Sequence, residues 1–252
     1  MISFGLVNIP IKIYSAIESN TPSFDLLHQK DMSPIRYARI CKKEDKEVPY
    51  DDIVKGYEYR KSKYVVIDES DFENANVRKT NTIDILSFAN LKEIDAIIFE
   101  KPYYLEPDEN AEKAYALLRE ALIQSKKVGI GKFVLRNKEH LVSLIPSGKI
   151  IILEQLRFIR EIRNPETLNL PEKEIASKRE VEMALEFINK FSERFDVGKY
   201  EDTYSKDLRK IISSKIKGKD VSAKGEIPSA TEVEELIDSL EKSLKLKKPV
   251  PQ

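Results

Sequence analysis

The sequence has 252 residues, of which 41% are hydrophobic and 34% carry a charge. This length suits one large domain with an extension or two domains, and the hydrophobic share is large enough for a folded core. Basic and acidic residues are equal in number, 43 of each. Composition alone therefore gives no support to a nucleic-acid-binding protein, because such proteins often have a basic excess.

Export and membrane insertion are not expected. The longest hydrophobic runs, such as residues 150–153, are far shorter than the roughly 20 residues of a membrane-spanning helix. The apolar first 14 residues lack the basic leading region and the cleavage site of a signal peptide, and Pro10 and Lys12 interrupt them. Cys41 is the single cysteine, so no intramolecular disulfide can form. We therefore expect a cytoplasmic protein with no membrane partner.

The first two thirds of the chain are predicted to be mainly strands. Isoleucines at positions 9, 11 and 13 alternate with Pro10 and Lys12, a period of two that is typical of a strand with proline at its edge. Further predicted strands cover residues 82–88, 94–99, 128–136, 140–145 and 149–159, and residues 57–67 are predicted to form a hairpin. Short strands at this spacing favour a barrel or a sandwich.

Helices are predicted at two places. One interrupts the strands from about residue 111 to 122, with Asp108 or Asn110 as its cap and two lysines at its C-terminus. The last third is mainly helical. There, Ser177 and Glu180 predict the start of a helix that ends at Gly198. Residues 206–216 predict another helix, and a capping box of Thr231 and Glu234 predicts a third.

No motif of a catalytic site is found. His28 and His140 are the only histidines and have no metal-ligand spacing, and Gly129-Ile130-Gly131-Lys132 lacks the second half of a phosphate-binding loop. This glycine pair more often marks the tight start of a strand. Asp51 and Asp52 are adjacent, so in a strand they would point to opposite faces. We predict that the chain is not an enzyme.

Basic residues gather in three stretches, and these are the informative feature. Residues 36–46 and 126–138 hold five basic residues each, and residues 206–224 hold seven with two acids. Clusters of this size can neutralise several DNA phosphates, although a run of charge is more often an ordinary solvated surface. No aromatic, helix-turn-helix or zinc-finger signature accompanies them, so any DNA binding would act through the backbone and tolerate any sequence.

The order of several sequence blocks resembles the prokaryotic Ku family. The opening Ile-Ser-Phe-Gly-Leu-Val-Asn-Ile-Pro-Ile-Lys-Ile-Tyr-Ser at 2–15 is similar to that family's first block. Seven later blocks follow in the family's order, at residues 26–28, 35–37, 51–59, 101–107, 113–122, 128–136 and 139–146. Each block alone is weak, but together they cover residues 2 to about 195 and are specific.

The resemblance implies a fold that is mainly β with α (α+β). It implies a Ku-type β-barrel core at 1–165 with a bridging arm at about 29–56, a helical C-terminal arm at 166–216, and a linker with a terminal helix at 217–252. Two copies would form a ring-shaped homodimer that threads onto a broken DNA end. The implied function is non-homologous end joining, a DNA repair process in which the family recruits and stimulates an ATP-dependent DNA ligase.

The resemblance and the basic stretches together give the expected site residues. The DNA-binding residues are expected to be Arg36, Arg39, Lys42, Lys43, Lys46, Lys126, Lys127, Lys132 and Arg136. The ligase is expected to dock on Tyr204, Leu208, Arg209, Ile211 and Ile212. Many relatives carry paired cysteines in the arm that suggest a zinc ribbon, but one cysteine cannot supply the usual four ligands. We therefore predict no metal and no cofactor.

Two other functions stay open from the residues alone. An interaction scaffold without a DNA role would fit the zero net charge. A hydrolase or nuclease would use Asp51, Asp52 or Glu100. Binding to linear but not closed circular duplex separates the ring from the scaffold, and metal-dependent DNA cleavage would reveal the nuclease.

Overall fold

The computed structural model describes residues 1–75, 82–135, 138–171, 176–219 and 236–245. The chain divides into two compact units. The first comprises Met1–Asn20 and Phe24–Asn164, and the second comprises Thr21–Ser23 and the chain from Pro165 onward. Within the described residues, no helix is long and apolar enough to cross a membrane.

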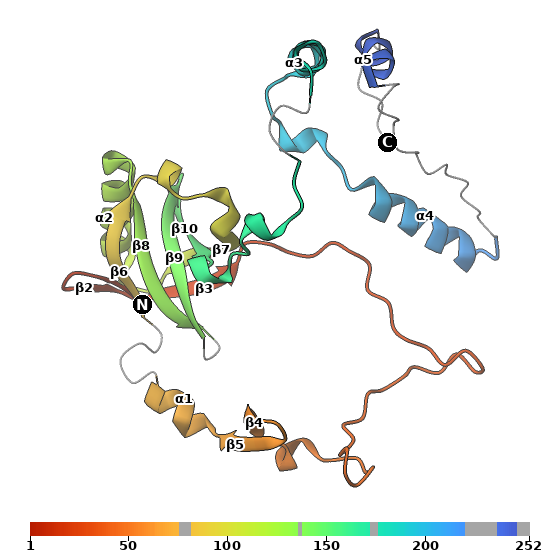
Figure 1. Ribbon diagram of the computed structural model, residues 1–252. Coiled ribbons are helices and arrows are strands. Elements are labelled where there is room, and N and C mark those ends of the chain that lie inside the picture. The colour runs from red at the N-terminus through yellow and green to blue at the C-terminus, as the bar shows by residue number, and fades with distance from the viewer. Residues whose placement is uncertain (76–81, 136–137, 172–175, 220–235, 246–252) are drawn as a thin grey trace. The chain divides into compact units, whose positions relative to one another are not determined.

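Eight strands of the first unit form one sheet, in the order β2-β1-β6-β8-β9-β10-β7-β3 (Figure 1). Neighbouring strands are antiparallel, except for β1 and β6, which are parallel. The strands are β1 (Ile2–Phe4), β2 (Val7–Ile9), β3 (Ile11–Ser15), β6 (Ile83–Ala89), β7 (Phe99–Pro107), β8 (Val128–Leu135), β9 (Lys138–Ser147) and β10 (Ile150–Leu156).

The chain itself brings the two edges of this sheet together. Strands β2 and β3 lie at opposite edges, yet only Pro10 separates them in the sequence. Proline suits this position because it has no N–H to leave unpaired where the strand changes partner. Its carbonyl accepts a hydrogen bond from the Asp108 N–H at 3.0 Å. The sheet is thus a nearly closed barrel with few exposed edges, and the strand predicted through Ile9, Ile11 and Ile13 is confirmed in two parts.

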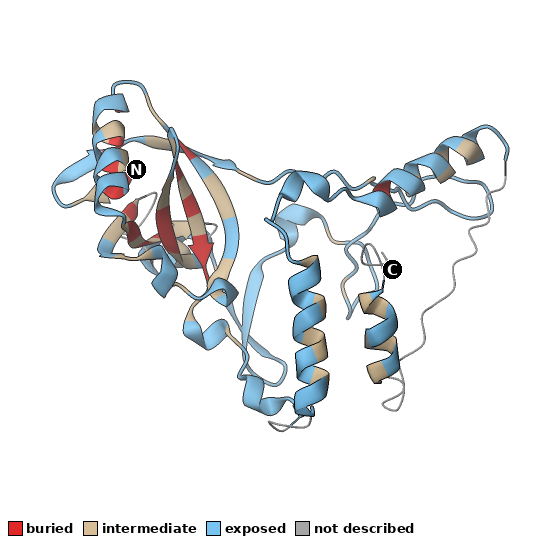
Figure 2. Ribbon diagram, turned by 90° about the horizontal axis from the view of Figure 1, so that it is seen from above, coloured by how far each residue is buried: buried red, intermediate tan, exposed pale blue. Residues whose placement is uncertain are grey.

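Helix α2 (Glu112–Ser125) packs on the barrel where β7 ends and β10 begins. Its Leu118 and Leu122 are buried among strand residues such as Leu144 and Ile151, and buried residues gather in this unit (Figure 2). The Tyr115 hydroxyl donates to the Leu105 carbonyl and accepts from the Ile151 N–H, each at 2.7 Å. The hydroxyl therefore joins β7 to β10 at this end of the barrel.

Two local predictions in this unit are wrong. Residues 94–99 are expected as a strand, but Ala96–Ile98 form a 3₁₀ turn because the Asp95 side chain accepts from the Ile97 N–H at 3.1 Å. The strand begins only at Phe99. Asp108 and Asn110 do not cap α2: the cap residue is Ala111, which makes no side-chain cap bond, and Asn110 instead takes a left-handed conformation with φ 67°.

The segment before β6 has no core of its own. Strands β4 (Lys55–Arg60) and β5 (Lys63–Ile67) form a separate two-stranded sheet, which confirms the predicted hairpin, and the short helix α1 (Glu69–Ala75) follows. From Pro10 to Ala75 no residue is buried. From here on, we call residues 24–75 the arm, a longer segment that includes the expected bridging arm of about 29–56; its residues are pale blue or tan in Figure 2.

The second unit contains α3 (Lys178–Phe191), α4 (Thr203–Ile216) and α5 (Leu236–Leu244). The predicted capping box of α3 is confirmed, because the Ser177 N–H donates to Glu180 Oε2 at 2.6 Å and the Glu180 N–H donates to Ser177 Oγ at 3.3 Å. The helix ends at Phe191, however, and not at Gly198. Helix α3 packs beside α5. The predicted capping box of Thr231 and Glu234 lies outside the described residues.

Candidate nucleic-acid interface

Two turns with the same backbone hydrogen bonds shape the arm. In the first, the His28 N–H donates to the Ser33 carbonyl at 2.8 Å and the Met32 N–H donates to the His28 carbonyl at 2.7 Å. In the second, the Cys41 N–H donates to the Lys46 carbonyl at 2.9 Å and the Asp45 N–H donates to the Cys41 carbonyl at 2.8 Å. Met32 and Asp45 both have positive φ, 58° and 54°. The arm is therefore ordered by local backbone bonds and not by burial.

The second turn carries the lysines that the sequence predicts for DNA binding. Lys42, Lys43 and Lys46 are all exposed, and within the described residues none of the three has an ion-pair partner. A tight turn with three exposed ammonium groups can approach several phosphates at once.

The two arginines before this turn are held loosely. The Arg36 guanidinium lies 3.8 Å from Glu47 Oε2 and its side chain is 87% exposed. The guanidinium of Arg39 lies 5.0 Å from the centre of the Tyr50 ring. An exposed ion pair of this length and an exposed cation–π contact each contribute little free energy, so both guanidinium groups can turn to a phosphate at small cost.

The predicted residues of the barrel are placed differently. Lys127 is half-buried and its Nζ donates to Asn90 Oδ1 at 2.9 Å. Lys132 Nζ lies 3.2 Å from Glu139 Oε2. Lys126 is exposed at the C-terminal end of α2. The structure thus ties two of these lysines to barrel groups, and the predicted Arg136 lies outside the described residues.

The arm turns do not form a metal centre. The first turn holds His28 and Asp31, and the second turn holds Cys41 and Glu44 at the corresponding positions. His28 Nδ1 and Asp31 Oδ1 are 3.1 Å apart, but in the described part of the chain, which includes both turns, no three such ligands lie close enough to hold a metal ion. These residues do not fit the zinc ribbon suggested by paired cysteines in relatives, and the absence of zinc stays a prediction.

The carboxylates considered for a nuclease are not arranged as one. Asp51 and Asp52 lie in an exposed 3₁₀ turn, Tyr50–Asp52. Glu100 accepts from Gln155 Nε2 at 2.9 Å and lies 3.5 Å from the Arg157 guanidinium. Glu100 therefore links β7 to β10 and does not form a carboxylate cluster with Asp51 and Asp52.

The residues expected to dock a ligase share one face of α4. Tyr204, Leu208, Ile211 and Ile212 recur at helical spacing, and Tyr204 is 74% exposed. Leu208, Ile211 and Ile212 are half-buried, and Arg209 is exposed beside them. The helix begins at Thr203, three residues before the predicted start, because the Asp202 carboxylate accepts from the Ser205 N–H at 2.9 Å.

Comparison with known proteins identifies this architecture. Residues 3–183 match the family described as the Ku70/Ku80 beta-barrel domain. The chain belongs to the Ku family. The resemblance read from the sequence blocks is therefore confirmed, as is the prediction of a protein that is not an enzyme. The Ku match covers the whole barrel and the arm and ends within α3.

Three relatives named "Non-homologous end joining protein Ku" are similar over nearly the full chain. The relative from Opitutus terrae is 40% identical, with 96% of this chain and 88% of the relative covered. The relative from Coxiella burnetii is 37% identical, with 98% and 92% covered. The relative from Archaeoglobus fulgidus is 39% identical, with 96% and 95% covered. The chain is thus a Ku protein of non-homologous end joining, with a mixed α and β fold.

Sequence reasoning missed one basic residue of the Ku barrel. Lys101 lies on β7 in register with Gln155 of β10. It shares the inner face of the strand with Tyr103 and the buried Leu105, because alternate residues of a strand point to the same side. The two prolines of β7, Pro102 and Pro107, argue against a strand, so the alternation that places Lys101 on this face, at an exposed position near the start of β7, could not be read.

Proposed function

We propose that two copies of the chain form a ring that binds the ends of double-stranded DNA without reading their sequence. The observation that carries this proposal is the arm. No residue from Pro10 to Ala75 is buried, although large apolar side chains such as Tyr37, Tyr57 and Val66 lie in this segment. A single two-stranded hairpin is at best marginally stable in water. The arm therefore needs further surfaces to pack against.

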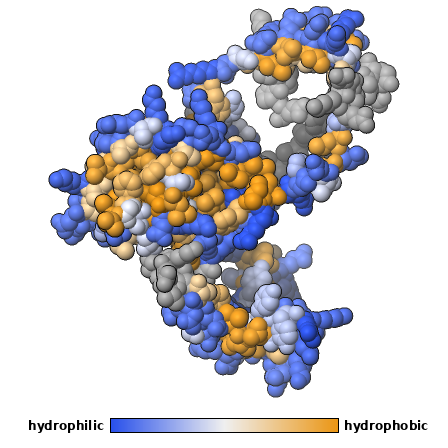
Figure 3. All heavy atoms as spheres, turned by 60° about the vertical axis from the view of Figure 1, so that its left-hand side comes forward, coloured by the Kyte–Doolittle hydropathy of each residue, from blue (hydrophilic) through white to orange (hydrophobic). Residues whose placement is uncertain are grey.

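Two kinds of surface fit the two kinds of side chain in the arm. The tyrosines and valines of β4 and β5 suit an apolar contact with a second copy, as in protein interfaces rich in aromatic residues. Hydrophobic side chains also cover a broad area of the barrel unit (Figure 3). The exposed lysines of the second turn suit phosphates, which carry no sequence information. A closed ring then admits a duplex only from its end.

The partner after DNA binding would be an ATP-dependent DNA ligase. An amphipathic helix that presents one apolar face is a common way to dock in a groove of a partner protein. The α4 face of Tyr204, Leu208, Ile211 and Ile212 has this form, and the exposed Arg209 lies beside it. The proposal assigns ligase recruitment and stimulation in double-strand break repair to this face.

Two measurements test the ring. The mass of the chain in solution, with and without a short blunt duplex, should be that of a dimer that gains one duplex. A gel-shift series should show binding to linear duplex and not to the same duplex in closed circular form. A lone subunit, or equal affinity for linear and closed molecules, would overturn the proposal.

The ligase face has its own experiment. Leu208→Ser together with Ile211→Ser should abolish stimulation of the ligase but leave the DNA gel shift unchanged. Lys206→Ser together with Lys210→Ser, on the opposite side of α4, is the matched control and should keep stimulation. If the first pair keeps full stimulation, the docking face lies elsewhere.

A further inference from the structure

The end of the barrel that lies away from α2 is polar on its inside. There β7 begins, β10 ends and β9 begins. Inward positions that are apolar nearer α2, such as Leu105, Leu144 and Leu153, give way at this end to Lys101, His140 and Gln155. Lys101 and Lys138 are exposed and His140 is half-buried, whereas Gln155 is only 6% exposed. This end of the barrel is therefore open to solvent and carries the positive charge of two lysines.

These side chains line a cavity of about 550 Å³. That volume lies within the range of roughly 300–1,000 Å³ that is usual for small-molecule sites. Among the described residues, the lining contains two lysines, one histidine and no carboxylate. The lining residues are Ile13, Ser15, Lys101, Tyr103, Leu135, Lys138, His140 and Gln155.

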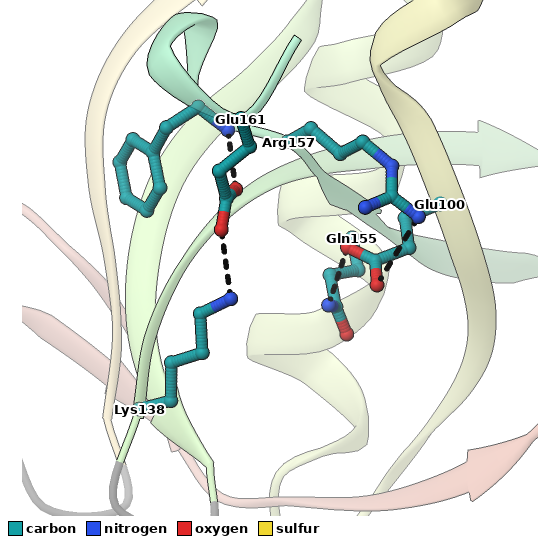
Figure 4. Close-up of polar contacts among 6 residues, drawn as sticks. Glu100, Lys138, Gln155, Arg157 and Glu161 are labelled. Atoms are coloured by element: carbon teal, nitrogen blue, oxygen red, sulfur yellow. Dashed lines mark hydrogen bonds and ion pairs between the residues drawn. The ribbon is translucent and has the colours of Figure 1, made fainter. Parts of the chain in front are cut away.

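Glu100 and Glu161 each bind one residue of this lining and have a further partner of their own (Figure 4). Glu100 binds the amide of Gln155 and lies 3.5 Å from the Arg157 guanidinium. Glu161 accepts from Lys138 Nζ at 2.8 Å and from the Phe158 N–H at 2.9 Å. Lys101 Nζ lies 5.3 Å from the centre of the Tyr103 ring, and among the described residues no carboxylate forms an ion pair with it. The exposed Lys101 ammonium group is thus able to bind an anionic ligand.

We propose that this cavity binds a nucleotide, with its phosphate held by Lys101 and Lys138. Ammonium groups bind phosphate oxygens through short, charge-assisted hydrogen bonds, and His140 can donate a further bond. Tyr103, Ile13 and Leu135 supply an aromatic and apolar wall for the base and sugar. The nucleotide is either free in solution or the unpaired last nucleotide of a DNA strand. Only the second source rests on the DNA-end function proposed above.

The ion pair between Lys138 and Glu161 should limit the affinity of the cavity for a nucleotide. A bound phosphate must draw the Lys138 ammonium away from Glu161, since a carboxylate and a phosphate compete for the same donor. Both members of the pair are partly exposed, 58% and 28% of their side chains. Removal of the Glu161 charge should therefore tighten nucleotide binding, whereas removal of Lys101 should weaken it.

The test uses the full chain and calorimetric titration with dAMP, deoxyadenosine and inorganic phosphate. We expect dAMP to bind more tightly than either fragment. Lys101→Ala should weaken dAMP binding roughly tenfold, and Glu161→Gln should tighten it roughly twofold to fivefold. Lys113→Ala removes an exposed lysine of α2, at the other end of the barrel, and should change nothing. Thermal unfolding of each variant checks that it is folded.

A second arm of the experiment separates the two sources of nucleotide. Linear duplexes with a blunt end or a three-nucleotide unpaired tail are bound with and without excess dAMP. Tighter binding of the tailed duplex that dAMP abolishes identifies the strand end as the source, and dAMP binding without a tail effect identifies the free nucleotide. No dAMP binding and no tail effect, or effects that Lys101→Ala leaves unchanged, overturn the inference. End preference over circular duplex, measured on the same samples, reports separately on the DNA-end function.

Discussion

The barrel and the arm are built on opposite principles. In the barrel, apolar side chains are buried in one cluster, and the lysines Lys127, Lys132 and Lys138 each have a polar partner. In the arm, nothing is buried and backbone turns supply the order. The barrel is therefore stabilised by contacts within the chain, whereas the arm depends on what it meets. Changes to the barrel should alter stability, and changes to the arm should alter binding.

The largest effect is expected at Gly131 of β8. A Cβ there would lie 2.5 Å from the Asp84 carbonyl oxygen of β6, and that atom is backbone and cannot turn away. Gly131→Ala should force the two strands apart and cost about 3 kcal/mol of unfolding free energy, measured by urea denaturation. Gly129→Ala is the control, because its Cβ would meet only side chains at 3.5 Å or more. Equal stability of the two variants would contradict this account of the barrel.

The second effect is expected at the Tyr115 hydroxyl. Tyr115→Phe leaves the Leu105 carbonyl and the Ile151 N–H without the bonds of 2.7 Å that join them through the hydroxyl. The unfolding free energy should fall by about 1–3 kcal/mol, the cost of unpaired buried polar groups. Tyr104→Phe, at an exposed position of the same strand as Leu105, should change the unfolding midpoint little. A stable Tyr115→Phe protein would show that water takes over the hydroxyl's bonds.

The sequence predicted those parts of the fold whose signals are local. The β4–β5 hairpin and the capping box of Ser177 with Glu180 depend on neighbouring residues, and both are confirmed. Strand β7 was missed because Pro102 and Pro107 argue against a strand, yet each sits where the ladder tolerates it. The closure of the barrel at Pro10 depends on pairing with residues about 95 positions away, which no local pattern contains.

The candidate site, like the fold, could be predicted only where its signal is local in the sequence. The exposed lysines of the second turn could be read as a basic stretch and remain candidates for phosphate contact. The sequence could not show that Lys127 and Lys132 differ from these lysines, because their partners Asn90 and Glu139 come from other strands or turns. The Ku family itself was read correctly, since the order of sequence blocks along the chain does not depend on knowing the fold.

The third prediction compares the lysines of the two regions directly. Replacement of Lys42, Lys43 and Lys46 by alanine should weaken binding to every duplex sequence equally, roughly tenfold at moderate salt. It should also flatten the plot of log affinity against log salt by about 0.9 for each phosphate that is no longer neutralised. Lys127→Ala with Lys132→Ala should change the slope less, because Asn90 and Glu139 hold these groups. A larger change from the barrel pair would reverse the assignment of the DNA-facing region.

The smallest effect is a difference in pH dependence between the two regions. In the arm, the Ser33 N–H donates to Asp31 and lowers the pKa of that carboxyl. In the barrel, burial raises the pKa of Glu154, which has no ion-pair partner among the described residues. A lowered folded-state pKa stabilises the fold above the unfolded-state pKa, and this stability is lost as pH falls through the folded value. A raised folded-state pKa destabilises the ionised form, so the Glu154 contribution improves as pH falls from its folded value to the unfolded value of about 4.3.

Glu154→Gln should therefore raise the thermal midpoint slightly at pH 7, and the gain should vanish below about pH 4, where the carboxyl of the wild type is protonated as well. Asp31→Ala should leave the thermal midpoint of the barrel unchanged at both pH values, since the arm carries no buried residue. Its effect should be seen instead in faster exchange of the Ser33 amide hydrogen at neutral pH. If Asp31→Ala lowers the barrel midpoint as much as Tyr115→Phe does, the arm and the barrel fold as one cooperative unit, and the contrast between self-stabilised barrel and partner-dependent arm is wrong.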